Sequence, residues 1–152
     1  MKKLFSILVI LAASTFMFTS VFAQGAAKTG PDPSLIRDAD LEQDSLHNLE
    51  VARHYFKLKK AYVAAIKRCE EIDAGNPNFA KMDEVLFIAG QSSLRLAENK
   101  GKQKATKTPD ELRNDARMYL GRLVAGYPQS SFFKQAESDL KVLGPATESP
   151  KP

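Results

Sequence analysis

The stretch that decides the fold runs from Leu46 to Pro77 and reads LHNLEVARHYFKLKKAYVAAIKRCEEIDAGNP. Small and apolar residues recur in it at intervals of three and four, the spacing of one face of an α-helix. In order, they are Leu49, Ala52, Phe56, Ala65, Cys69 and Ile72. Gly75 and Pro77 end the run, because glycine permits a left-handed turn and proline cannot continue a helix. The stretch therefore predicts two antiparallel helices, over about residues 45–58 and 61–74.

Counted from Leu46 as the first residue of a 34-residue unit, these residues occupy the small and apolar positions of a tetratricopeptide repeat (TPR). A second copy begins near Phe79, with a helix over about 80–99 that sets Gly90 at position 8, the small residue where the two helices of a repeat approach most closely. Position 20 should follow 12 residues later, but the matching Ala116 lies 116 − 90 = 26 residues on, so about 14 residues are inserted. The second helix of this copy is expected over about 109–125.

Equal spacing of the two helix ends supports the repeat. Pro77 follows Ala65 by 12 residues, and Pro128 follows Ala116 by 12 residues. One further helix, over about 131–143, fits the cap that a stacked array needs at its end. The sequence therefore predicts an all-α fold, a TPR-like α-solenoid of about two helix pairs plus a C-terminal capping helix. The residues that we expect to contribute to its core also include Leu46, Tyr62, Ile66, Leu112, Tyr119, Leu120, Leu123, Val124, Phe132, Phe133, Ala136, Leu140 and Leu143.

The two ends of the chain differ in composition from the helical part. Residues 1–23 have a basic start, an apolar run and small residues before Gln24, the layout of a cleavable signal peptide; an uncleaved membrane anchor is the alternative. Residues 24–44 are expected to be a disordered linker, and residues 144–152 a disordered tail. The helical domain is then 45–143, with Asp44 or Ser45 capping its first helix.

Charge and cysteine content argue against a nucleic-acid-binding protein, a disulfide-stabilised protein and a lipoprotein. Removing Lys2 and Lys3 with the signal peptide leaves 20 basic against 18 acidic residues, so the net charge of about +2 gives no reason to expect nucleic acid as a partner. The lone Cys69 cannot form an internal disulfide, and no cysteine follows the cleavage site to carry a lipid. We expect Cys69 to be a buried apolar residue.

No set of catalytic residues is apparent. His47 and His54 are seven residues apart, roughly 10 Å along a helix, which is too far for both to bind one zinc ion. With only these two histidines and a cysteine that we expect to be buried, no nucleophile–base pair is apparent. We expect neither enzyme activity, nor a cofactor, nor a metal site.

A peptide-binding groove is the better candidate. In repeats of this type, positions 2, 5, 9, 12 and 13 of the first helix line the concave surface. By register they are His47, Glu50, His54, Lys57 and Leu58 in the first unit, and Glu84, Phe87, Gln91, Leu94 and Arg95 in the second. Their mixed character suits an extended peptide of a protein partner. The alternative is that Phe87, Leu58 or Leu94 packs under the last helix or the insertion.

The insertion, about residues 99–108, is the most basic stretch after the signal peptide. Its candidate residues for contact with an anionic surface or an acidic partner are Lys100, Lys102, Lys104 and Lys107. The alternative is a mobile, solvated loop. Thr108, followed by Pro109 and two acids, predicts the start of the next helix.

The helix ends carry a resemblance to a known family. Gly126-Tyr127-Pro128-Gln129-Ser130, and more loosely Gly75-Asn76-Pro77-Asn78, are similar to the repeats of the BamD-type outer-membrane lipoproteins. The resemblance implies a periplasmic scaffold, associated with the outer membrane, that takes part in β-barrel assembly through protein contacts. The chain departs from the family in lacking the lipidated cysteine and in having about two and a half repeats instead of five, which favours a free-standing periplasmic relative. Partner, oligomeric state and binding face stay open, and a structural adaptor using its convex face is a further alternative.

Overall fold

A computed structural model describes residues 38–146 of the 152-residue chain. The predicted signal peptide, the linker up to residue 37 and the tail from residue 147 lie outside the described residues. The described part contains helices and no strands, which confirms the all-α class. In chain order the elements are α2 (Ala39–His54), the π-helical turn η2 (Tyr55–Lys59), α3 (Tyr62–Gly75), α4 (Met82–Ala97), α5 (Pro109–Gly126) and α6 (Phe133–Leu143).

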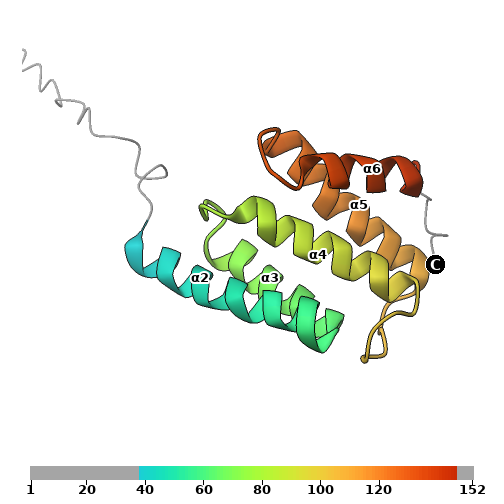
Figure 1. Cartoon of the computed structure of the whole chain (residues 1–152), viewed down its shortest axis with the longest axis horizontal. Coiled ribbons are helices and arrows are strands. Elements are labelled where there is room, and N and C mark those ends of the chain that lie inside the picture. The colour runs from blue at the N-terminus through green and yellow to red at the C-terminus, as the bar shows by residue number, and fades with distance from the viewer. Residues whose placement is uncertain (1–37, 147–152) are drawn as a thin grey trace, which may run out of the picture. The chain divides into compact units, whose positions relative to one another are not determined.

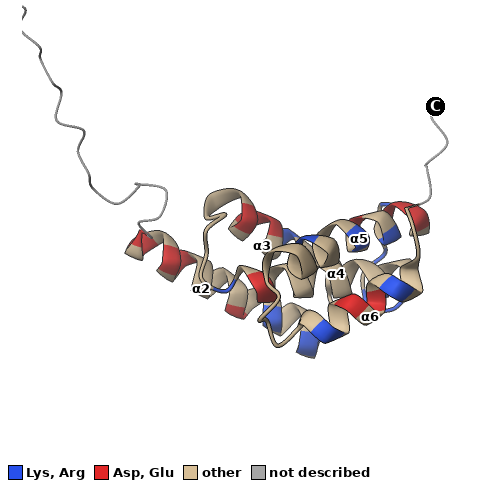
Figure 2. Cartoon of the chain, turned by 90° about the horizontal axis from the view of Figure 1, so that it is seen from above, with Lys and Arg blue, Asp and Glu red and all other residues tan. Residues whose placement is uncertain are grey.

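The helices of residues 38–146 lie in two layers. Figures 1 and 2 show α2, α4 and α6 side by side in one layer, with α3 and α5 behind them in the other. Each helix packs against the next one along the chain, and α2 also contacts α4. The main core lies between the layers, and its largest fully buried side chains include Leu49, Ile72, Met82, Leu86, Leu120 and Leu123.

The first helix begins earlier than predicted. The carboxylate of Asp38 accepts hydrogen bonds from the backbone N–H groups of Asp40 and Leu41, at 2.9 and 3.4 Å, so α2 starts at Ala39 and not at residue 45. The predicted cap, Ser45, is instead buried inside α2, where its hydroxyl oxygen accepts a hydrogen bond from the Asn76 amide at 3.2 Å. The boundary predicted from the sequence misses this start because it was based on the apolar stripe, and Asp38 lies before the first residue of that stripe.

The end of the first helix also differs from a regular α-helix. After His54 the backbone widens into η2, and the turn closes with Lys60 at φ +52° and a hydrogen bond from Ala61 N–H to the Tyr55 carbonyl at 3.0 Å. A link of only two residues then leads into α3. The sharp turn leaves the side chain of Leu58 71% exposed, so Leu58 does not pack under the last helix or the insertion, which was the alternative to a place in the groove.

The second pair, α4 and α5, packs closely at Gly90. A Cβ atom added at Gly90 would lie 2.7 Å from both Cγ and Cδ2 of Leu120, so only glycine fits there without a shift. The predicted start of α5 is confirmed: Thr108 and Glu111 form a reciprocal capping box, with Pro109 at the first helical position. The close approach predicted from the repeat position of Gly90 is therefore present.

Several predicted core residues are less buried than expected. Leu46 is 37% exposed because it lies on the side of α2 away from the buried stripe, and Ile66 and Val124 are only partly buried. In the last helix only Ala136 is fully buried. The residues that α6 leaves half-buried are Phe132, Phe133, Leu140 and Leu143. Within residues 38–146, α6 packs mainly on α5, and no later helix covers its other side.

Candidate functional site

The candidates on the first helix form one exposed strip. His47, Glu50, His54 and Lys57 are all exposed and follow one another at intervals of three, four and three residues, which places them on one face of the helical segment α2–η2. The fully buried Leu49 and the other core residues lie on the opposite side. Polar and charged groups of this strip are therefore free to meet a partner from solvent.

Two of the candidates on α4, Phe87 and Gln91, instead contact α6 or its N-cap residue. The ring of Phe87 stacks on Phe132 with centroids 4.5 Å apart and planes 19° apart. The side-chain amide of Gln91 donates a hydrogen bond to the carboxylate of Asp139. The alternative reading of Phe87, that it packs under the last helix, is the one that the structure bears out.

Leu94 lies further along α4, toward the C-terminal end of that helix. It packs against the main core and lines an open cavity of about 320 Å³ between α4, α5 and α6. The remaining lining residues are Ala97, Glu98, Arg113, Asp139, Val142 and Leu143. None of the α2 candidates lines this cavity, so the cavity does not bring Leu94 together with them.

Arg95 covers two aromatic rings. Its guanidinium carbon lies 5.0 Å from the centroid of the Phe56 ring and 5.7 Å from that of Tyr62. Its Nε is buried and has no hydrogen-bond partner within the described residues. The contact joins α4 to η2 and to the start of α3 by cation–π attraction, so much of the Arg95 side chain is used inside the fold.

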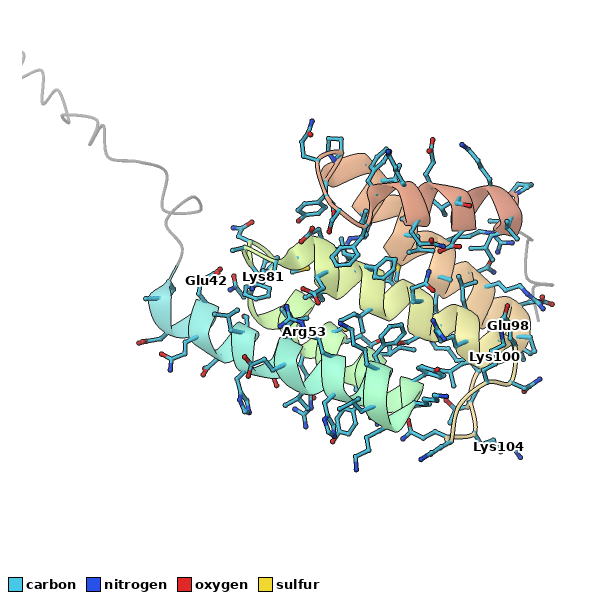
Figure 3. All side chains as sticks on the ribbon, viewed as in Figure 1. Glu42, Arg53, Lys81, Glu98, Lys100 and Lys104 are labelled. Atoms are coloured by element: carbon cyan, nitrogen blue, oxygen red, sulfur yellow. The ribbon has the colours of Figure 1, made fainter. Side chains whose placement is uncertain are left out.

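One residue that joins the two helices was not among the candidates. Arg53, labelled in Figure 3, donates from Nε and from one terminal nitrogen to the two carboxylate oxygens of Glu84, both at 2.6 Å, and so bridges α2 to α4. This contact with Arg53 lowers the pKa of Glu84 and raises that of the guanidinium. In the sequence, Arg53 stood out only by occupying position 8, where the repeat usually has a small residue.

A matching bridge lies in the other layer. Arg122 of α5 donates to both carboxylate oxygens of Asp73 on α3, at 2.6 and 2.7 Å. Hydrogen bonding to Arg122 lowers the pKa of the Asp73 carboxyl. Both layers are thus crossed by a bidentate arginine–carboxylate pair that links the first helix pair to the second.

The basic insertion is anchored to the first helix pair. The backbone N–H of Lys102 donates to the carbonyl of Lys60 at 3.1 Å, and the Gln103 side chain accepts a hydrogen bond from Ala64 N–H at 3.1 Å. Gly101 makes this approach with φ +105°, and an added Cβ would lie 2.6 Å from the Tyr62 ring. The insertion therefore holds a defined position against η2 and α3, which the reading as a mobile loop did not foresee.

The four candidate lysines of the insertion fall into two kinds. Lys100 pairs with Glu98 at 2.8 Å, and Lys107 pairs with Asp115 at 2.6 Å. Lys102 and Lys104 are exposed and form no ion pair with another described residue. Figure 3 shows Lys100 beside Glu98 at the end of α4, and Lys104 further out on the loop.

Groups that could support covalent or metal chemistry are not gathered in the described part. No three His, Cys, Asp or Glu side chains of residues 38–146 are arranged to hold a metal ion. Burial raises the pKa of the Cys69 thiol to about 12, with Glu70 as a smaller cause, so the thiolate is scarce at neutral pH. None of the helices described is both long and apolar enough to cross a bilayer.

Comparison of the chain with protein-family models, with curated proteins and with solved structures finds no match. The geometry of the described residues and the sequence pattern are therefore what a functional proposal has to rest on.

Proposed function

We propose that this chain is a non-enzymatic helical adaptor of TPR-like architecture, which binds a protein or peptide partner on the face formed by α2, α4 and α6. The observation that carries the proposal is the exposed strip of His47, Glu50, His54 and Lys57. It lies in the layer that corresponds to the first helices of successive repeats, the helices that line the concave surface in TPR arrays.

The strip offers the mixture of groups that orients an extended peptide. Glu50 and Lys57 supply charges of both signs, and the two histidines supply ring nitrogens that donate or accept hydrogen bonds. The partly exposed Leu46, four residues before Glu50, adds an apolar contact on the same side of α2. The apolar anchorage expected from Phe87 is absent from this proposal because α6 covers that ring.

The ion pair between Arg53 and Glu84 holds α2 and α4, two of the helices of the proposed binding face, in a fixed relative position. Their side chains are 29% and 16% exposed, so the pair is partly shielded from water and holds α2 in one position against α4. A partner bound along α2 then meets a preformed surface and does not have to order it, which favours affinity.

The compartment and the family belong to the same proposal. A signal-peptide pattern in residues 1–23 and the resemblance of the helix ends to the BamD-type repeats support an exported, periplasmic protein associated with assembly at the outer membrane. We propose a short, unlipidated relative of that group, whose partner is a component of the envelope.

Site-specific crosslinking tests the binding face. A photoreactive residue placed at His54 should crosslink one defined envelope protein in cells, whereas the same residue at Lys67, exposed on α3 in the other layer, should not. Crosslinking from Lys67 alone would transfer the function to the convex face and contradict the proposal.

A charge exchange provides the matched variant. Glu50→Lys combined with Lys57→Glu keeps the net charge and should weaken capture of that partner by tenfold or more, since charge pairs across an interface fix its register. The control exchange is Arg68→Glu with Glu71→Arg, which reverses an existing ion pair on α3 in the other layer and should leave capture unchanged. Equal capture by both exchanged variants would exclude the strip as the binding site.

A further inference from the structure

Two basic segments that are far apart in the sequence meet at one end of the first helix pair. The η2 turn and its exit carry Lys57-Leu58-Lys59-Lys60, and the insertion carries Lys102 and Lys104. The hydrogen bond from Lys102 N–H to the Lys60 carbonyl, at 3.1 Å, joins the two segments directly. In Figure 1 the loop between α4 and α5 accordingly lies beside the end of η2.

We call the surface formed by Lys59, Lys60, Lys102 and Lys104 around Leu58 the basic tip. All four lysines are exposed, and none forms an ion pair with a residue of the described part. The segments 55–61 and 98–107 contain one acidic residue, Glu98, and it is already paired with Lys100. The tip therefore presents positive charge that the fold itself does not neutralise.

The geometry of the tip is set by the backbone. Lys60 has a left-handed conformation, η2 closes on Ala61, and Gln103 accepts the N–H of Ala64 in the first turn of α3. These contacts hold the four lysines on adjoining turns. Neither the η2 turn nor the insertion would form this arrangement alone, because the hydrogen bonds join one segment to the other. The sequence drew attention to Lys100 and Lys107, but the structure assigns both to ion pairs.

Leu58 shows which kind of anionic partner the tip suits. Its side chain is 71% exposed at the outside of a turn whose flanking residues are lysines. Basic side chains around a protruding apolar residue are typical of segments that lie in the interface of a bilayer, where the charges meet head groups and the apolar group enters the acyl boundary. Single-stranded nucleic acid would need exposed aromatic rings, but Arg95 lies over Phe56 and Tyr62.

We propose that the basic tip docks on a bilayer surface that contains anionic phospholipid, with Leu58 inserted among the lysines. The opposite end of α2 carries the acids Asp38, Asp40, Glu42 and Asp44, seen as red bands at the start of α2 in Figure 2. This separation of charge along the first helix pair turns the tip, and not the acidic end, toward a negative surface. The tip adjoins the strip at Lys57 but shares no residue with it, so this function does not depend on the proposed partner.

Vesicle flotation with the full chain tests the docking. One set of vesicles is phosphatidylcholine alone, and a second contains about one-third phosphatidylglycerol. The tip variant combines Lys59→Gln, Lys60→Asn, Lys102→Gln and Lys104→Gln, with asparagine at residue 60 because it tolerates positive φ. The control variant changes Lys67, Lys81, Lys134 and Lys141 to Gln, so that the net charge falls by the same amount at exposed sites elsewhere.

At low salt a lysine near an anionic surface strengthens binding about fivefold, so the tip variant should lose on the order of several hundredfold in affinity for the anionic vesicles. The control variant should lose far less. Circular dichroism melts should show both variants folded. The proposal is overturned if the tip variant binds as tightly as the original chain, if both variants lose equally, or if the original chain does not distinguish anionic from neutral vesicles. Equal binding of the original chain to anionic and neutral vesicles would trace the binding to the apolar N-terminal segment, which all variants share.

Leu58→Gln tests the apolar part separately. We expect a several-fold loss of vesicle binding that persists when salt screens the lysines, because burial of an apolar side chain is not screened. An unchanged affinity at both low and high salt would remove Leu58 from the docking surface.

Discussion

In the repeat register predicted from the sequence, Arg53 and Gly90 occupy the same position of the two helix pairs, and the fold uses them in opposite ways. Gly90 lets α4 and α5 come so close that a single added carbon would overlap Leu120. Arg53, at position 8 of the first copy, points its guanidinium to Glu84 of the neighbouring pair. One pair is thus built for close packing within itself, and the other for attachment to its neighbour.

The difference shows how a short array holds together. Within the second pair, stability comes from apolar contact at a glycine, which depends on shape alone. Between the pairs, it also comes from directed hydrogen bonds with charged groups, one bridge in each layer. Departures from a repeat pattern are therefore informative, because Arg53 marks the place where the first pair contacts the second.

The largest expected effect is at Gly90. Gly90→Val should destabilise the fold by about 2–3 kcal/mol, because Leu120 is fully buried and cannot move aside without disturbing the core. Urea denaturation followed by circular dichroism would measure it. Gly121→Ala is the control: nothing lies within 4 Å of the added carbon, so helix propensity should stabilise that variant by up to about 1 kcal/mol. Similar effects at both glycines would show that the close approach does not matter.

Removing the bridge between the pairs should have a smaller effect. Arg53→Ala is expected to cost about 1–2 kcal/mol, since it leaves the Glu84 carboxylate partly buried and without its bidentate donor. A double-mutant cycle with Glu84→Ala should give a coupling of about 1 kcal/mol. The same cycle at Asp73 and Arg122, where the arginine side chain is 44% exposed, should give less. A larger coupling in the exposed pair would reverse this ranking.

The bridge should also be visible in the dependence of stability on pH. Arg53 lowers the pKa of Glu84 in the folded protein, so this group contributes stability above its unfolded pKa of about 4.3. That contribution is lost as pH falls through the lowered folded pKa. Glu84→Gln should therefore reduce the free energy of unfolding by about 1 kcal/mol at neutral pH and make little difference in strong acid. Parallel stability curves for the two proteins from neutral to acidic pH would exclude this account.

The smallest effect is expected where the insertion meets the first pair. Gln103→Ala removes the side-chain acceptor for Ala64 N–H and should cost about 0.5–1 kcal/mol, the range of other helix-capping groups. Hydrogen exchange at Ala64 should quicken in this variant. Gln129→Ala, at an exposed site in the turn after α5, should change neither quantity. Unaltered exchange at Ala64 in the Gln103 variant would mean that the contact does not anchor the loop.

Features that depend on neighbours along the chain could be predicted. The apolar intervals located every helix, although α4 and α6 each begin two residues later than expected. Thr108 and Pro109 marked the start of α5 because their effect on the first turn is local. The start of α2 was wrong because Asp38 caps from outside the apolar stripe on which the boundary was based.

The candidate site could be predicted only in part. The exposure of His47, Glu50, His54 and Lys57 follows from helical spacing on a helix that has one buried side. Phe87 and Gln91 follow the same rule, but their exposure depends on where α6 lies, and no local pattern shows that. A register carried over from long arrays does not account for the last helix of a short one.

The sequence by itself determined that the described chain is helical, where Gly90 brings two helices together and which side of α2 is polar, since each follows from residues within a few turns of one another. Only the tertiary structure decided that Arg53 pairs with Glu84, 31 residues away, and that Gln103 caps a helix 39 residues before it. It also brought Lys59 and Lys60 beside Lys102 and Lys104. Such contacts depend on how whole helices pack, because a long side chain or a loop has many reachable partners until the core fixes their positions.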